Sequence, residues 1–267
     1  EWPITVISFE EFRTPVQPPV GRWRRALPLF GTVIALWLRW RWLRIKRRFL
    51  DTERATQATH HFHRAAALSI VRRAVKHQGL VVKTCQFLGS RADILMDEYV
   101  RTLSLVHDQV PPRPWSEMRP VIESELGKSI DELYEEFEEE PVAAASLAQV
   151  YRGRLNDGTP VAIKVQYPGV EKIVQHDLQA LRMLVNLWSR FEQVIDFRPI
   201  IDEMERNAPE EVDFIHEGRA AEKLATLLDD RNDVVIPKIY WKYSSQRVLT
   251  MDFIDGIKIS DVQRQRV

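Results

Sequence analysis

The chain has 267 residues, which is enough for one large domain or two small ones with a sizeable hydrophobic core. Its formal net charge is zero, so no overall field favours nucleic acid, and we expect no nucleic acid as a partner. Cys85 is the single cysteine, which excludes an internal disulfide and is typical of a reducing compartment.

The charges are unevenly distributed along the sequence. Residues 1–50 contain ten Arg or Lys against three acidic residues, whereas residues 117–140 contain ten Asp or Glu against two basic ones. The chain begins at Glu1 and stops at Val267 soon after a strand-like run. We therefore expect it to be the N-terminal portion of a longer protein.

A basic, tryptophan-rich segment follows an irregular, proline-containing arm over residues 1–20. Its uncharged run, residues 26–38, has 13 residues, which is too short to span a bilayer, and no cleavage site follows it. Arg and Trp flank the run on both sides, as in helices that lie at a membrane surface. We favour a peripheral helix on the cytoplasmic face of a membrane. The alternative is a helix packed on the protein with a solvated basic face.

Residues 51–82 are predicted to be helical and are rich in Ala, Arg and His. The imidazoles of His60, His61 and His63 raise the possibility of a metal site. No Cys and few acidic residues lie nearby in the sequence, so we interpret them as a polar helix face and predict no metal site.

The next segment, residues 80–95, is predicted to be an amphipathic helix that carries Lys83 and Gln86 on one face. Two short helices are expected over residues 115–126 and 129–137, with Ser129 as the cap of the second.

A β-hairpin is predicted around Asn156-Asp157-Gly158, because these residue types tolerate positive φ. The strand before the turn is entered through a string of small residues. On the strand after it, Lys164 alternates with apolar neighbours. In protein kinases such an arrangement lets the first loop cover a nucleotide while the lysine holds its phosphates. An ordinary hairpin with an exposed lysine is an equally open interpretation at this point.

Two helices and two strands are predicted after the hairpin. The helices cover residues 170–193 and 199–207, and carboxylates cluster near the start of a further helix after residue 210. The strands cover residues 234–241 and 246–254.

Taken in order, these motifs resemble the UbiB family of atypical protein-kinase-like proteins over about residues 76–262. The family motif Lys-x-Gly-Gln is similar to Lys83-Thr84-Cys85-Gln86, and its Glu-x-Asp motif is similar to Glu211-Val212-Asp213. The alanine-rich loop that replaces the kinase glycine-rich loop resembles Ala143-Ala144-Ala145-Ser146.

The resemblance implies a nucleotide site and a fold. Lys164 would hold the phosphates of ATP or ADP, Glu217 would pair with Lys164, and Met251-Asp252-Phe253 would be the hinge that meets adenine. The expected fold class is α+β, a kinase-like N-lobe with a small antiparallel sheet and a long C-type helix. A helical N-terminal extension would precede the lobe and pack on it.

The implied domain limits are 1–50 for the arm and membrane-surface helix, 51–137 for the helical extension, and 138–267 for the kinase-like lobe up to the hinge. In the family the helix with the lysine motif packs over the active site. Lys83 would therefore meet Glu211 or Asp213 in a buried pair.

Two departures from the family pattern bear on function. Cys85 stands where the motif has Gly and adds bulk to that helix. The catalytic-loop Asp and Asn and the metal-binding Asp-Phe-Gly segment would lie beyond Val267. We therefore expect no catalytic residue and no Mg²⁺ ligand in this chain, and no turnover from it alone.

The leading hypothesis is the ATP-binding portion of a membrane-associated UbiB-type kinase or ATPase. The resemblance links it to ubiquinone or other prenyl-quinone lipids, with phosphoryl transfer or ATP hydrolysis rather than ordinary protein phosphorylation. Its partners would be ATP, a membrane lipid such as a prenyl-quinone or its precursor, and quinone-biosynthesis proteins. The alternative hypotheses are a non-catalytic, pseudokinase-like module that binds lipid or a partner, and a structural adaptor built on residues 21–50.

Overall fold

The computed structural model describes residues 21–107, 110–190 and 196–257. The arm predicted for residues 1–20 lies outside these residues. The chain divides into two compact units, and neither is continuous in sequence. The first unit is residues 1–114, 144–149 and 167–212, and the second is residues 115–143, 150–166 and 213–267. The predicted limits at residues 50 and 137 stay a prediction.

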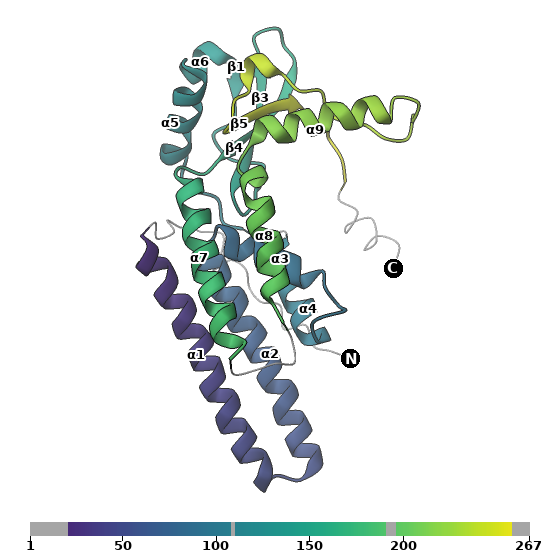
Figure 1. The fold of residues 1–267 in the computed structure, drawn as a ribbon. Coiled ribbons are helices and arrows are strands. Elements are labelled where there is room, and N and C mark those ends of the chain that lie inside the picture. Colours follow the sequence, from purple (N-terminus) through teal and green to yellow (C-terminus); the bar gives the residue numbers. More distant parts are fainter. Residues whose placement is uncertain (1–20, 108–109, 191–195, 258–267) are drawn as a thin grey trace. The chain divides into compact units, whose positions relative to one another are not determined.

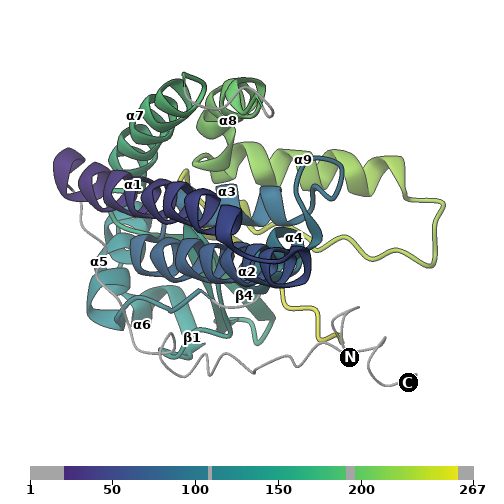
Figure 2. The ribbon, with the colours of Figure 1, turned by 90° about the horizontal axis from the view of Figure 1, so that it is seen from below.

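The first unit is a group of packed helices (Figure 1, Figure 2). Its helices are α1 (Arg22–Lys46), η2 (Arg47–Phe49), α2 (Thr52–His77), α3 (Leu80–Gly89), α4 (Asp97–Leu103), η3 (Ser104–His107), α7 (Val170–Trp188) and α8 (Arg198–Glu211). Helices α1 and α2 form a long hairpin, and α1 also packs against α7. Helix α3 lies among α2, α4 and α7. The helices α7 and α8, which the sequence analysis grouped with the kinase-like lobe, therefore pack with the N-terminal helices.

The break between α2 and α3 depends on backbone geometry at two residues. Gln78 and Gly79 have φ of 53° and 68°, the left-handed region that favours glycine. A Cβ on Gly79 would lie 2.7 Å from Oδ2 of Asp177 and 2.8 Å from Cγ2 of Ile173. Only glycine therefore allows the start of α3 to approach α7 this closely.

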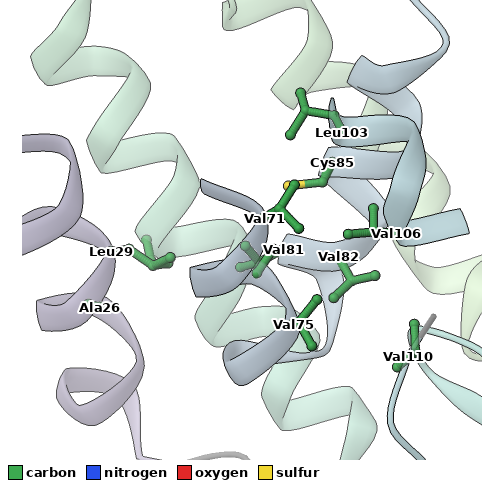
Figure 3. Packing of buried hydrophobic residues seen from close by; sticks show 12 residues of the cluster. Ala26, Leu29, Val71, Val75, Val81, Val82, Cys85, Leu103, Val106 and Val110 are labelled. Carbon is green, nitrogen blue, oxygen red and sulfur yellow. The ribbon is translucent and has the colours of Figure 1, made fainter. Parts of the chain in front are cut away.

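Buried apolar side chains from α1, α2, α3, α4, η3 and α7 form the core of the first unit. Figure 3 shows the Cys85 side chain inside this cluster, from the motif helix α3. The buried members are Ala26, Leu29, Val71, Ala74, Val75, Val81, Val82, Cys85, Leu103, Val106, Val110 and Ala180.

A fully buried ion pair crosses this unit. Arg25 of α1 donates from Nε to Oδ1 of Asp177 at 2.7 Å and from Nη2 to Oδ2 at 2.8 Å. The backbone N–H of Leu80, the first residue of α3, donates to the same Oδ2 at 3.0 Å. The imidazole of His77 lies 3.5 Å from Oδ1, and burial lowers the pKa of His77. One carboxylate on α7 thus contacts α1, the end of α2 and the start of α3.

The second unit contains a small sheet with the strand order β1-β3-β4-β5, and β2 pairs with β3. The pairs β1–β3 and β4–β5 are antiparallel. This mixed helical and antiparallel-sheet architecture confirms the predicted fold class. Its elements are α5 (Trp115–Leu126), α6 (Ile130–Leu133), β1 (Tyr134–Phe137), β2 (Ala143–Ala144), β3 (Ala148–Leu155), β4 (Pro160–Gln166), α9 (Phe214–Leu227), η4 (Trp241–Tyr243) and β5 (Val248–Asp252), with the unit boundary passing through β2 and β3.

Three predicted elements differ from the structure. The helix expected over residues 80–95 ends at Gly89. The helix expected over residues 129–137 ends at Leu133, because Tyr134 starts β1 and pairs with Leu155 of β3. The strand expected over residues 234–241 is reduced to one bridge between Ile239 and Met251. Local propensity gave the wrong conformation for residues 134–137 and 234–241, because pairing with a distant strand decides the conformation of such segments.

We expect an Asp177→Asn substitution to lower the free energy of unfolding by about 3 to 5 kcal/mol, because it removes the negative charge of the carboxylate that pairs with the buried Arg25 guanidinium. Urea denaturation of the variant and of the wild-type protein measures this loss.

The double variant Arg25→Met with Asp177→Leu is the control, because it removes both charges and keeps apolar volume. It should lose less than the single variant. A double variant that is less stable than Asp177→Asn would contradict a role for charge burial.

Candidate functional site

Lys164 and Glu217 form an ion pair in the second unit. On β4, Val161, Ile163 and Val165 are buried, and Lys164 points to the opposite, partly exposed face, as the alternation predicted. Its Nζ donates to Oε1 of Glu217 at 2.6 Å and to Oε2 at 2.7 Å. The two side chains are 25% and 43% exposed, so a ligand can reach them.

The start of α9 fixes the position of Glu217. Asp213 caps this helix by accepting from the N–H of Ile215 at 3.0 Å, and the N–H of the buried Phe214 donates to the carbonyl of Gln246 at 3.0 Å. Glu217 lies in the first turn, where the helix dipole favours a carboxylate. The next residue must be small, because a Cβ on Gly218 would lie 2.6 Å from the indole of Trp241. These contacts of α9 therefore keep the Glu217 carboxylate within hydrogen-bonding distance of Lys164 on β4.

Phe214 is a part of this site that the sequence analysis missed. Its ring lies 4.7 Å from Nζ of Lys164, so the ammonium contacts both an aromatic face and a carboxylate. An apolar residue three positions before Glu217 on a helix is a signal that could have suggested a shared face.

The alanine-rich segment begins as the short strand β2 and contains no left-handed residue. Ala143 and Ala144 form β2, the N–H of Ala145 donates to the carbonyl of Ala148 at 2.7 Å, and Ser146 is buried. None of these four described loop residues has a positive φ. The unit boundary falls between Ala143 and Ala144. Backbone hydrogen bonds therefore hold this loop, and it has less conformational freedom than a glycine-rich loop would have.

The segment expected to be the hinge ends β5. Met251 pairs with Ala162 of β4, and the N–H groups of Asp252 and Phe253 donate to the carbonyls of Lys238 and Pro160. The Asp252 carboxylate accepts from the hydroxyl of Tyr240 at 2.7 Å, and this hydrogen bond raises the pKa of Tyr240 to about 12. These two N–H groups and this carboxylate are already used within the sheet, so a ligand here would need other groups.

The lysine motif lies in the first unit. Lys83 of α3 donates to Oε2 of Glu211, the last residue of α8, at 2.8 Å. Of the two partners expected for Lys83, Glu211 and Asp213, the structure therefore shows Glu211. Gln86 donates to the carbonyl of Val106 at 3.1 Å. The expectation of a buried pair is wrong, because the Lys83 and Glu211 side chains are 40% and 36% exposed. Solvent screens such a pair, so it contributes at most about 1 kcal/mol to stability.

Cys85, the residue that replaces the motif glycine, fills space in the core. Its side chain is buried in the cluster of Figure 3, and burial raises the pKa of its thiol to about 12. The thiol is therefore protonated at physiological pH and acts as a small apolar group rather than as a nucleophile.

Two histidines of α2, His60 and His63, contact α4. Nδ1 of His60 lies 2.6 Å from Oε1 of Glu98, and Nδ1 of His63 lies 3.1 Å from the hydroxyl of Tyr99. Burial lowers the pKa of His63, although the nearby Glu98 carboxylate opposes this shift. Within residues 21–107, 110–190 and 196–257, no group of three or more His, Cys, Asp or Glu is arranged to hold a metal ion.

A small antiparallel sheet whose strand lysine pairs with a helix glutamate is an arrangement typical of protein-kinase-like folds. The ABC1 atypical kinase-like domain matches residues 105–266. The chain therefore belongs to the ABC1 atypical kinase-like family, and the UbiB resemblance inferred from the motifs is confirmed.

Two relatives agree with this assignment. The chain is 38% identical over 185 residues to AarF domain-containing protein kinase 1 of Xenopus laevis, covering 69% of this chain and 36% of that protein. It is 34% identical over 260 residues to the protein ACTIVITY OF BC1 COMPLEX KINASE 8, chloroplastic, of Arabidopsis thaliana, covering 92% of this chain and 34% of that protein.

The chain is also similar in fold to Rv3197 from Mycobacterium tuberculosis, solved in complex with erythromycin. The TM-score is 0.51 at 24% identity, covering 81% of this chain and 55% of that chain. The chain spans 34% to 40% of the length of the curated relatives named AarF domain-containing protein kinase 1 and of the Arabidopsis protein.

We expect iodoacetamide to leave Cys85 unmodified in the folded protein at pH 8 and to modify it fully in denaturant, because burial and the raised pKa suppress the thiolate. Intact mass spectrometry before and after unfolding measures the modification. Labelling of the folded protein at the rate of an exposed cysteine would show that α3 opens or that Cys85 is not in the core.

Proposed function

We propose that this chain supplies the nucleotide-binding lobe of an ABC1-type atypical kinase or ATPase. The observation that carries the proposal is the ion pair between Lys164 of β4 and Glu217 of α9. In protein kinases a strand lysine held by a helix glutamate positions the phosphates of ATP. Lys164 offers a compact ammonium charge that Glu217 and Phe214 orient, and its partial exposure leaves room for a phosphate oxygen.

The neighbouring segments have proposed roles as well. The alanine-rich segment, residues 143–146, would cover the phosphates, and its backbone would have less conformational freedom than a glycine-rich loop. Met251, Asp252 and Phe253 would lie beside the adenine. Lys83, Gln86, Glu211 and Asp213 would regulate access as the family motif does. Mg²⁺ would accompany the nucleotide and neutralise charge on its phosphates. Among the described residues no group of three or more His, Cys, Asp or Glu is arranged to hold a metal ion, so we assign no residue to this role.

Helix α1 supports a membrane-associated role. None of the described helices is long and apolar enough to cross a membrane. One face of α1 packs on α2 and α7, while the other exposes an apolar row at helical spacing, flanked by arginines. We call these residues the α1 outer row: Trp23, Leu27, Ile34, Leu38, Trp42 and Ile45. The row would lie in the interface of a membrane that holds the lipid substrate, a prenyl-quinone or its precursor, and phosphoryl transfer or ATP hydrolysis would act there.

We expect Lys164→Met to weaken ATP binding at least about tenfold, because one charge-assisted bond to phosphate is lost. Calorimetric titration of the natural full-length protein with ATP measures the affinity. The pair is partly exposed and adds little to stability, so the variant should fold.

The matched control is Lys172→Met, which removes an exposed lysine of α7 and should leave ATP affinity unchanged. Glu217→Gln should also weaken binding, because Lys164 loses the partner that orients it. Equal ATP affinity and hydrolysis in wild-type protein and Lys164→Met would exclude the proposed phosphate role.

We expect the double variant Ile34→Ser with Leu38→Ser to bind vesicles about tenfold less tightly, because two apolar side chains no longer enter the membrane interface. Flotation of the protein with vesicles that contain anionic lipid measures the bound fraction. A control that replaces the exposed Leu227 and Val235 by Ser should bind as wild type. Equal loss in both variants would contradict a specific role for the α1 outer row.

A further inference from the structure

A cavity of about 670 Å³ lies where α1 ends, η2 follows and α2 begins. Figure 1 shows this turn at the lower tip of the α1–α2 hairpin, beyond the end of α7. Four guanidinium side chains line it, together with Ile45 and the first residues of α2. The guanidiniums are those of Arg41, Arg44, Arg47 and Arg48.

The positive charge around this cavity is not balanced within the part of the chain that the structure describes. None of the four arginines forms an ion pair there, and the guanidinium of Arg41 lies 5.4 Å from the centroid of the Trp37 ring. The nearest acidic side chains in sequence are engaged elsewhere. Asp51 caps α2 by accepting from Arg54, and Glu53 accepts from Gln57. The cavity therefore presents four cationic groups to whatever enters it.

Helix electrostatics account for part of this arrangement only. Basic residues in the last turn of α1, Arg44 and Lys46, stabilise the negative end of its dipole. Arg47 and Arg48 lie beyond that turn, and Arg41 lies before it. All four side chains are exposed, so solvent screens their mutual repulsion, but an anion that enters the hollow meets four cationic groups.

We propose that this cavity binds the phosphate-bearing headgroup of an anionic membrane lipid. Guanidinium groups donate two parallel hydrogen bonds to phosphate oxygens, so four of them match a headgroup with more than one anionic oxygen pair. The volume is in the range of small-ligand sites. We name these residues and this hollow the arginine pocket.

The surroundings favour a lipid over a soluble phosphate. Ile45 lines the pocket, and Trp42 lies one helical turn before Ile45. Both are exposed members of the α1 outer row, and Phe49 of η2 is 84% exposed. Apolar side chains beside a phosphate site would enter the acyl layer while the headgroup enters the pocket. The inference rests on the membrane-association part of the proposed function and is independent of nucleotide binding.

The test is binding of the natural full-length protein to phosphatidylcholine vesicles that contain phosphatidic acid. The same measurement on vesicles with phosphatidylserine, adjusted to equal surface charge, separates phosphate recognition from general attraction. The variant Arg44→Gln with Arg47→Gln should bind phosphatidic acid vesicles at least about tenfold less tightly than wild type. Its binding to phosphatidylserine vesicles should fall less.

Two controls separate the pocket from diffuse charge. Arg72→Gln with Lys76→Gln removes the same charge from exposed positions of α2 outside the pocket and should change binding less than about twofold. Arg44→Lys with Arg47→Lys keeps the charge but not the planar fork, so it should keep phosphatidylserine binding and lose the preference for phosphatidic acid. All these positions are exposed, so melting temperatures should match wild type.

Each outcome decides between explanations. Equal losses in the pocket variant and the α2 control, or no preference for phosphatidic acid in wild type, would overturn the proposal. Tight binding of inorganic pyrophosphate that vesicles do not displace would show a soluble-phosphate site instead. Absence of wild-type binding to any anionic vesicle would remove the membrane part of the proposed function as well, whereas ATP affinity would remain a separate readout.

Discussion

The carboxylate of Asp177 is the interaction on which the first unit depends. It is fully buried, neutralises the Arg25 guanidinium through two hydrogen bonds, and accepts from the N–H of Leu80. The first N–H groups of a helix have no partner within that helix, so a carboxylate from another helix determines where α3 begins. Gly79 permits the close approach that this needs. The helix that carries Lys83 and Gln86 is therefore positioned by α7.

This constraint gives α1 two different faces. On the inner face of α1, Arg25, Ala26 and Leu29 are buried. This face therefore packs inside the first unit. The α1 outer row is exposed, and four arginines lie near the turn to α2. The two interpretations of the basic segment left open by its sequence are thus compatible: the helix packs on the protein and still presents an amphipathic surface. In the second unit, the Lys164–Glu217 pair is partly exposed, which suits a binding group more than a stabilising one.

The sequence predicted what depends on local pattern. The alternation around Lys164, the hairpin at Gly158 and helix α5 follow from periodicity and turn chemistry, whereas the family motifs were identified by their resemblance to a known family. It could not predict what depends on distant partners, such as the burial of Arg25, the strand at Tyr134 or the exposure of the Lys83–Glu211 pair. Asp177 did leave a signal, because a charged residue between Ile173 and Ala180 on an apolar helix stripe requires a buried partner.

Hydrogen exchange at the amide of Leu80 tests the central claim most directly. The N–H donates to Asp177 inside the core, so we predict that it exchanges at least about 1000-fold more slowly than an exposed first-turn amide. Thr52, the exposed first residue of α2, provides the fast reference in the same experiment. Exchange of Leu80 as fast as that of Thr52 would contradict the claim that Asp177 determines the start of the motif helix.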